Sequence, residues 1–137
     1  MTDYLVDNSV WARLATGDAS ITARLRRIER APADLFVTCP PQVLEFCHSA
    51  RTPEEHLLYR EQIGLGFPLE HAPDESLVLD IQAALWNSGL VRSAGAVDIL
   101  IAGYAIVNDA TVLTADHDFD HIASVSDLRH EYVAPSP

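Results

Sequence analysis

The chain has 137 residues, enough for one domain, and 48% of them are hydrophobic, so it can bury a sizeable core and disorder is excluded as its main state. Twenty acidic residues against nine basic ones, all arginine, give a formal net charge of −11, which argues against tight, sequence-independent binding of nucleic acid through its phosphates. No apolar run reaches the roughly 18 residues that span a bilayer, and no signal peptide opens the chain, so we expect one domain over residues 1–137, in the cytoplasm and without a membrane.

Short apolar runs predict buried strands, and apolar residues at helical spacing predict the helices between them. The predicted strands cover residues 4–7, 35–38, 67–69, 111–114 and 131–133. The predicted helices cover residues 18–30, 40 to about 50, a segment after 53, 74–87 and 97–107. The helix over 97–107 is apolar nearly all round and is expected to be buried.

The alternation of short strands and helices predicts an α/β fold, with a short parallel sheet covered by helices on both faces in three layers. The two cysteines, Cys39 and Cys47, are too few for a disulfide framework or a cysteine-based zinc site, so we expect buried thiols. In a parallel α/β sheet, functional groups gather at the carboxyl ends of the strands. Asp7 ends the first strand and Asp116 follows the strand over 111–114, so two acids from distant segments can meet at one edge.

Each acid also has a purely structural interpretation. Asp7 suits the N-cap of a following helix. Glu45 shares a face with His48 and Ser49 on a helical wheel, away from the predicted apolar side, which favours a solvated position. Asp98 opens an apolar helix, where a charge is costly unless it caps the helix or binds a ligand.

The segment around Asp116 is different, because Asp116, Asp118 and Asp120 alternate within five residues and repel one another. A cation would relieve that repulsion. The spacing imitates the start of an EF-hand, but His121 stands where that loop needs glycine, and a strand precedes the segment, so we reject an EF-hand.

Together these segments resemble the PIN-domain family, and within it the VapC-type toxins of bacterial toxin–antitoxin pairs. The resemblance rests on four segments that occur in the family's order and cover nearly the whole chain: Tyr4-Leu-Val-Asp-Asn-Ser9, Glu45 in an early helix, Asp98-Ile-Leu-Ile-Ala-Gly-Tyr-Ala105 and Val112-Leu-Thr-Ala-Asp-His-Asp-Phe119.

The resemblance implies a PIN-like fold with a catalytic metal site formed by Asp7, Glu45, Asp98 and Asp116. It further implies that Ser9 hydrogen-bonds within this site and that Asp118 assists nearby. Arg92 falls where such toxins often carry a basic residue, so it is a candidate contact for RNA. The implied partners are an RNA substrate, a cognate antitoxin and a second copy of the chain in a homodimer.

The implied activity is Mg²⁺-dependent (or Mn²⁺-dependent) endoribonuclease hydrolysis by a metal-activated water, leaving a 3′-hydroxyl and a 5′-phosphate. One or two such ions activate water and neutralise phosphoryl charge, and each takes only one or two carboxylates, so four acids suffice. The arginine-rich helix over 24–30 can steer phosphates locally, although a solvated helix face explains it better.

Other α/β enzymes fit less well. A phosphoacceptor receiver domain needs a lysine, which the chain lacks, and a haloacid-dehalogenase-type phosphatase needs a second Asp where Ser9 stands. The alternative that stays open is a catalytically inactive PIN-like module that only binds RNA or a partner.

Overall fold

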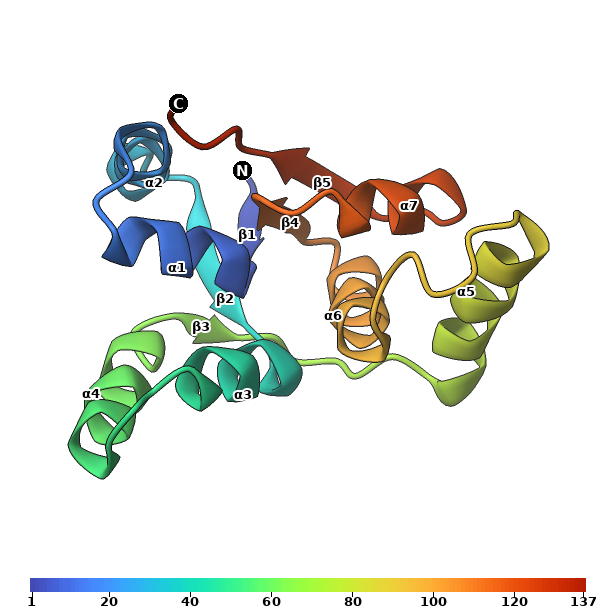
Figure 1. The fold of residues 1–137 in the computed structure, drawn as a ribbon, viewed down its shortest axis with the longest axis horizontal. Helices are drawn as coiled ribbons and strands as arrows, with labels where there is room; N and C mark the ends of the chain where they lie inside the picture. The colour runs from blue at the N-terminus through green and yellow to red at the C-terminus, as the bar shows by residue number, and fades with distance from the viewer.

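Five short strands form a parallel sheet at the centre of the fold, in the order β3-β2-β1-β4-β5 (Figure 1). The computed structural model describes residues 1–137. The strands are β1 (Asp3–Val6), β2 (Leu35–Thr38), β3 (Phe67–Pro68), β4 (Thr111–Thr114) and β5 (Arg129–Tyr132).

Seven helices connect the strands and cover both faces of the sheet. They are α1 (Asn8–Ala15), α2 (Ala19–Arg30), α3 (Pro40–His48), α4 (Pro53–Ile63), α5 (Glu75–Asn87), α6 (Ala96–Val107) and α7 (Asp118–Ser124). Figure 1 shows α1 and α2 on one side of the strands and α5, α6 and α7 on the other. The predicted three-layer α/β/α fold is therefore confirmed.

The two faces of the sheet carry separate hydrophobic cores, because successive side chains of a strand point to opposite faces. Leu5 of β1 packs into the core under α5, α6 and α7, whereas Tyr4 and Val6 pack into the core under α1 and α2. Helix α2 contributes Ile21, Leu25 and Ile28 to this second core, as its sequence pattern predicts. Helices thus pack on both faces of the sheet, and this packing fixes the positions of the strand ends.

Two helices were not predicted. Helix α1 begins directly after Asp7, and α7 lies where the alternating acids suggested only a turn. Each is short, at eight and seven residues, and periodicity is difficult to recognise over two turns.

The prediction that the helix over 97–107 is fully buried was wrong in part. Helix α6 buries Ile99, Ile101 and three small residues, but Val97, Leu100 and Val107 remain between 36% and 43% exposed. One face of this apolar helix therefore has no cover within the chain. No helix in the fold combines the length and the hydropathy that crossing a bilayer requires.

Candidate metal and active site

The carboxyl ends of β1 and β4 lie side by side and bring two of the predicted acids together. Val6 of β1 is the register partner of Leu113 of β4, and the Asp7 backbone N–H continues the pairing by donating to the Leu113 carbonyl at 2.9 Å. Asp116 follows β4 by two residues. The parallel pairing of these two strands is what places acids 109 residues apart in sequence at one edge.

Asp7 is 5% exposed and is held on one of its two carboxylate oxygens. Its Oδ2 accepts hydrogen bonds from the Ser9 hydroxyl at 2.6 Å, from the Ser9 backbone N–H at 3.3 Å and from the Thr114 hydroxyl at 3.2 Å. The bond from the Ser9 N–H makes Asp7 the N-cap of α1. Because these bonds all use Oδ2, Oδ1 remains available to a ligand.

Thr114 also contacts the acids at this edge, and the sequence interpretation missed it. Its buried side-chain hydroxyl bonds Asp7 and also accepts the backbone N–H of Asp116 at 3.0 Å, so it links the two acids. Ser9 adds a parallel link, because its hydroxyl accepts the backbone N–H of Ala115 at 3.0 Å. A hydroxyl residue at the end of a strand, two residues before an acid, was the available signal.

Glu45 lies on α3 and turns toward Asp7. The solvated position that the helical wheel favoured is therefore wrong. Its Oε1 is buried without any hydrogen-bond partner, whereas the neighbouring Leu44 is 70% exposed. Burial raises the pKa of Glu45, and the charge of Asp7 raises it further. A buried carboxylate oxygen without a donor is costly unless a cation or a proton meets it.

Gln42 positions α3 against the first strand, and it too was missed by the sequence interpretation. Its side-chain Nε2 donates to the Val6 carbonyl at 2.6 Å, and its Oε1 accepts the Cys39 N–H at 3.3 Å. Gln42 is 1% exposed and precedes Glu45 by one helical turn, so it sets where Glu45 enters the site. Glutamine at the third position of a helix is a known capping residue, which was the available signal.

Asp98 occupies the first turn of α6 but does not cap it. The N-cap residue is Gly95, and the structure records no hydrogen bond to the Asp98 carboxylate. Burial, followed by the charges of Asp7, Glu45, Asp118 and Asp116, raises the pKa of Asp98 to about 7. The charges of four other carboxylates thus act on Asp98, which places these four acids around it.

Asp116 and Asp118 complete this region from the segment between β4 and α7. The Asp118 backbone N–H donates to Oδ1 of Asp116 at 3.0 Å and fixes the orientation of that carboxylate. Burial and the neighbouring Asp116 raise the pKa of Asp118. Below, the acid cluster means Asp7, Glu45, Asp98, Asp116 and Asp118.

Arg92 lies outside the acid cluster. It is exposed in the loop before α6, with a positive φ of 57°, and it makes no ion pair. The structure thus brings together the acids of the predicted site and Ser9, whereas Arg92 makes no ion pair with any of these acids.

The acid cluster is chemically suited to a hard divalent cation, although it does not form a closed cage. No three His, Cys, Asp or Glu side chains lie close enough together to enclose an ion. The free Oδ1 of Asp7 and the unpaired Oε1 of Glu45 are nevertheless oxygen ligands without competing donors. Mg²⁺ keeps several waters and uses few carboxylates, so an open oxygen site of this kind fits it.

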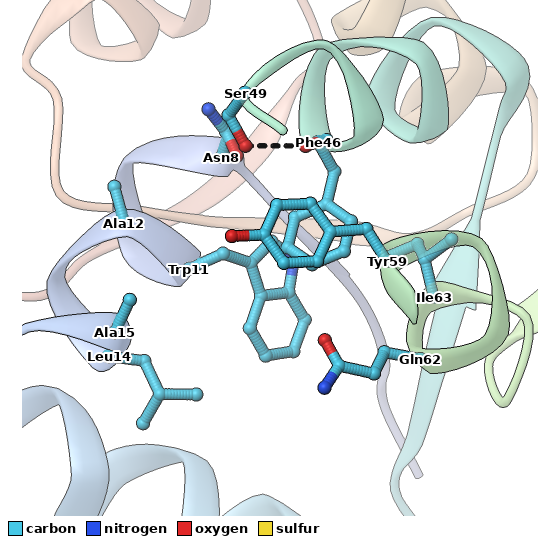
Figure 2. A pocket seen from close by; sticks show the side chains of 10 residues that line it. All are labelled: Asn8, Trp11, Ala12, Leu14, Ala15, Phe46, Ser49, Tyr59, Gln62 and Ile63. Atoms are coloured by element: carbon cyan, nitrogen blue, oxygen red, sulfur yellow. Dashed lines mark hydrogen bonds between the residues drawn. The ribbon is translucent and has the colours of Figure 1, made fainter. Parts of the chain in front are cut away.

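A groove adjoins the acid cluster without including any of its carboxylates. It has a volume of about 450 Å³ and lies between α1, α3 and α4. Figure 2 shows the rings of Trp11, Phe46 and Tyr59 gathered in it, and the ring centroids of Phe46 and Tyr59 are 5.0 Å apart. Asn8 and Phe46, which line the groove, are the chain neighbours of Asp7 and Glu45.

Comparison with known proteins identifies the family. The family model described as PIN domain matches residues 4–125. The chain is 30% identical over 131 residues to Ribonuclease VapC11 of Mycobacterium tuberculosis, a match that covers 91% of this chain and 95% of that protein. It is 31% identical over 135 residues to Ribonuclease VapC21 of the same species, covering 96% and 94%.

Solved structures with low sequence identity share the fold. VapBC-1 from nontypeable Haemophilus influenzae superimposes with a TM-score of 0.71 at 21% identity, and DNA-bound VapBC from Salmonella typhimurium with a TM-score of 0.70 at 18% identity. Both matches cover 96% of this chain and 98% of the other. On these grounds the chain belongs to the PIN-domain family, among the VapC ribonucleases.

Proposed function

We propose that the acid cluster is the Mg²⁺ site at which this chain hydrolyses RNA, and that the chain acts as the toxin of a toxin–antitoxin pair. The observation that carries this proposal is the convergence of carboxylates from three distant segments on Asp98, whose pKa burial and these charges raise to about 7. A fold does not keep so many like charges together for stability, because they repel each other. A divalent cation, with Mn²⁺ as the alternative to Mg²⁺, removes that repulsion.

Four side chains would hold the metal: Asp7, Glu45, Asp98 and Asp116. Bound Mg²⁺ would supply a water activated for attack and would neutralise charge on the phosphoryl oxygens. The protein's part is orientation. Ser9 and Thr114 hold Oδ2 of Asp7 so that Oδ1 faces the site, and the Asp118 N–H fixes the carboxylate of Asp116.

The reaction needs no side-chain nucleophile. A water oxygen forms a bond to phosphorus as the bond from phosphorus to the 3′-oxygen breaks, and the leaving oxygen takes up a proton. The products are a 3′-hydroxyl and a 5′-phosphate. Asp98 must be ionised to act as a ligand, and a bound cation favours its charged form.

The groove between α1, α3 and α4 suits an apolar segment of the antitoxin. Seven of the ten residues that line it are hydrophobic, and the Nε1–H of Trp11 is buried there without an acceptor. Several solved neighbours are VapBC complexes, which agrees with a protein partner of this kind. An antitoxin segment in this groove would lie next to the acid cluster, where it can control access to it.

A homodimer is proposed on the exposed apolar side chains of α5 and α6. Leu79 and Trp86 lie seven residues apart on α5, and Val97, Leu100 and Val107 follow helical spacing on α6. Such lines of exposed apolar residues on adjacent helices are typical of an interface. Sedimentation of the purified chain would test it.

The deciding experiment is the cleavage of total cellular RNA by purified protein, with Mg²⁺ and with EDTA, beside Asp7→Asn. Asparagine caps a helix about as well as aspartate, so the variant should fold while losing the metal-dependent activity. End-group analysis should find 3′-hydroxyl and 5′-phosphate ends. A 2′,3′-cyclic phosphate would exclude water as the nucleophile, and equal cleavage by Asp7→Asn would indicate a contaminating ribonuclease.

The alternative function, a catalytically inactive module that binds RNA or a partner, makes the opposite prediction. Such a module would cleave no RNA with any metal, and Asp7→Asn would change nothing except metal affinity. The presence of all the acids in one region speaks against it, since a module that only binds RNA gains nothing from concentrated negative charge.

A further inference from the structure

A stacked pair of aromatic rings flanks the acid cluster on its β5 side. His117 stands between Asp116 and Asp118, and its ring lies on the ring of Tyr132 with centroids 4.1 Å apart and planes 20° apart. Tyr132 is the last residue of β5, and its register partner Thr114 is the last residue of β4. The pair therefore lies at the same carboxyl edge of the sheet as the acids, where β5 and α7 meet (Figure 1).

The imidazole of His117 is fixed in place although it is exposed. Its Nδ1 lies 2.8 Å from Oδ2 of Asp120, and the other oxygen of Asp120 lies 2.6 Å from Nε2 of the half-buried His130. Tyr132 covers one face of the ring. The side chain remains 68% exposed, so the other face is open to solvent.

The start of α7 does not account for this arrangement. His117 occupies the N-cap position, yet its side chain makes no capping hydrogen bond to the backbone. An exposed pair three residues apart, such as His117 and Asp120, contributes little to stability. Tyr132, Asp120 and, through Asp120, His130 thus hold one open aromatic face in a fixed orientation without a clear benefit to the fold. A fixed, open face of this kind is what a preorganised binding surface presents.

A flat aromatic face beside a phosphodiester site suits an unpaired nucleobase. Proteins recognise single-stranded RNA by stacking splayed bases on His, Tyr, Phe or Trp. The Cα of His117 is about 3.8 Å from those of Asp116 and Asp118, so a base next to a phosphate at the acid cluster is within reach of the ring. Stacking also suits this chain in particular, because its charge of −11 opposes phosphate binding but not contact with a base.

We propose that His117 and Tyr132 form a stacking platform for an unpaired RNA base next to the scissile phosphate, with Asp120 and His130 as positioning residues. The platform selects single-stranded RNA over a closed duplex, since a paired base cannot lie on it. This inference rests on the proposed ribonuclease function.

The test uses an oligoribonucleotide copied from the cleavage site that the parent protein makes in total cellular RNA. KM and kcat are measured for the parent, His117→Ala, His117→Phe, Tyr132→Ala and the control His71→Ala, which removes an exposed histidine elsewhere. Binding is measured separately in an Asp7→Asn background. Base stacking is lost with His117→Ala, so KM and the dissociation constant should rise about fivefold to a hundredfold, with kcat little changed. His117→Phe keeps an aromatic ring on Tyr132 but loses the bond to Asp120, so it should weaken binding much less than His117→Ala does.

A series of abasic probes locates the stacked base. Removing that one base should weaken RNA binding by the parent as much as the His117→Ala substitution does. It should not weaken RNA binding by the His117→Ala variant any further, because both changes remove the same contact. Tyr132→Ala gives the same test if His117→Ala fails to fold, which its melting temperature would show.

Three results would overturn the platform while leaving the ribonuclease intact. They are parent-like KM and binding in both alanine variants, equal weakening by His117→Ala and His117→Phe, and additive losses at every abasic position. If the parent cleaves no RNA under any metal, the proposed function itself fails and the platform with it.

Discussion

The side-chain amide of Gln42 donates a 2.6 Å hydrogen bond to the carbonyl oxygen of Val6, the residue before Asp7. This buried bond ties the first turn of α3 to the end of β1, so it sets the position of Glu45 relative to Asp7. The two acids come from different elements, and no other hydrogen bond of a side chain on α3 reaches β1. The proposed metal site therefore depends on a residue that would hold no metal.

Replacing Gln42 with alanine should damage both stability and activity. The buried carbonyl of Val6 and the N–H of Cys39 lose their partners, which costs about 1–3 kcal/mol in the free energy of unfolding. Metal-dependent cleavage should fall further than the loss of folded protein explains, because α3 and Glu45 can shift. Urea unfolding and cleavage rates measure the two effects. Gln82→Ala on α5 is the control, and a Gln42→Ala protein with full activity per folded molecule would show that Gln42 does not position Glu45.

The pKa of Asp98 predicts how stability and metal binding change with pH. Because burial and four carboxylates raise this pKa from 3.8 to about 7, the folded protein keeps a proton that the unfolded chain loses near pH 4. The free energy of unfolding in EDTA should therefore fall as the pH rises from about 4 to about 7. The pKa values of Glu45 and Asp118 are raised as well, so they act in the same direction.

A bound cation reverses this trend, since it favours the ionised carboxylates and releases their protons. Mg²⁺ at about a hundred times its dissociation constant should stabilise the fold by roughly 2.7 kcal/mol, and its apparent affinity should increase from about pH 6 to about pH 8. Thermal melts in EDTA, Mg²⁺, Mn²⁺ and Ca²⁺ across this range measure both. Asp98→Asn should flatten the EDTA curve, whereas the exposed Asp80→Asn should not. Melting temperatures that are identical in EDTA and in every metal would contradict the site.

The groove predicts that antitoxin binding and RNA cleavage can be separated by one substitution. Tyr59 packs on Phe46 in the groove, and its hydroxyl contacts only Glu55, outside the acid cluster. A central aromatic residue of this kind is a typical hot spot, so Tyr59→Ala should weaken antitoxin binding by about 2 kcal/mol or more. Cleavage of RNA by the free chain should not change.

The control for this prediction is Leu57→Ala, which removes an exposed apolar side chain of α4 that does not line the groove. Binding is measured by titration with the cognate antitoxin, and cleavage is measured on total RNA. If Tyr59→Ala binds the antitoxin as the parent does, the antitoxin occupies another surface.

The sequence predicted the strand ends well and the helix faces less well. A parallel sheet brings its carboxyl ends to one edge, so Asp7 and Asp116 can be paired from their positions after β1 and β4 alone. The helical wheel placed Glu45 on a solvated face, because a wheel assumes one buried face, whereas the family resemblance assigned it to the metal site. Helix α3 instead contacts α1, α4 and α6, so Leu44 is exposed and an oxygen of Glu45 is buried.

Residues that position the acids are hard to find from sequence because their contacts are long-range and polar. Thr114 contacts Asp7 across 107 positions, and Gln42 contacts Val6 across 36. The only local signal for Thr114 is a hydroxyl residue at a strand end two residues before an acid, and it does not reveal the contact with Asp7. The resemblance to a family supplies the acids, but the hydrogen bonds that orient them come only from the folded chain.

The last prediction concerns Thr114, whose hydroxyl bonds Oδ2 of Asp7 at 3.2 Å and the backbone N–H of Asp116 at 3.0 Å. Thr114→Val keeps the shape of the side chain but removes both bonds and leaves the Asp116 N–H without its partner, at a cost of about 1–3 kcal/mol in stability. Asp7 and Asp116 then lose a shared anchor.

We expect Thr114→Val to bind Mn²⁺ about tenfold more weakly, equivalent to roughly 1.4 kcal/mol, and to cleave RNA more slowly even at saturating metal. The second effect follows because both carboxylates gain rotational freedom in the site. Thr114→Ser keeps the hydroxyl and loses only a methyl group, so it should bind the metal and cleave RNA as the parent does. Calorimetric titration with Mn²⁺ and single-turnover cleavage measure the two variants side by side. If Thr114→Val binds Mn²⁺ and cleaves RNA as well as Thr114→Ser does, the hydroxyl bridge does not orient Asp7 and Asp116.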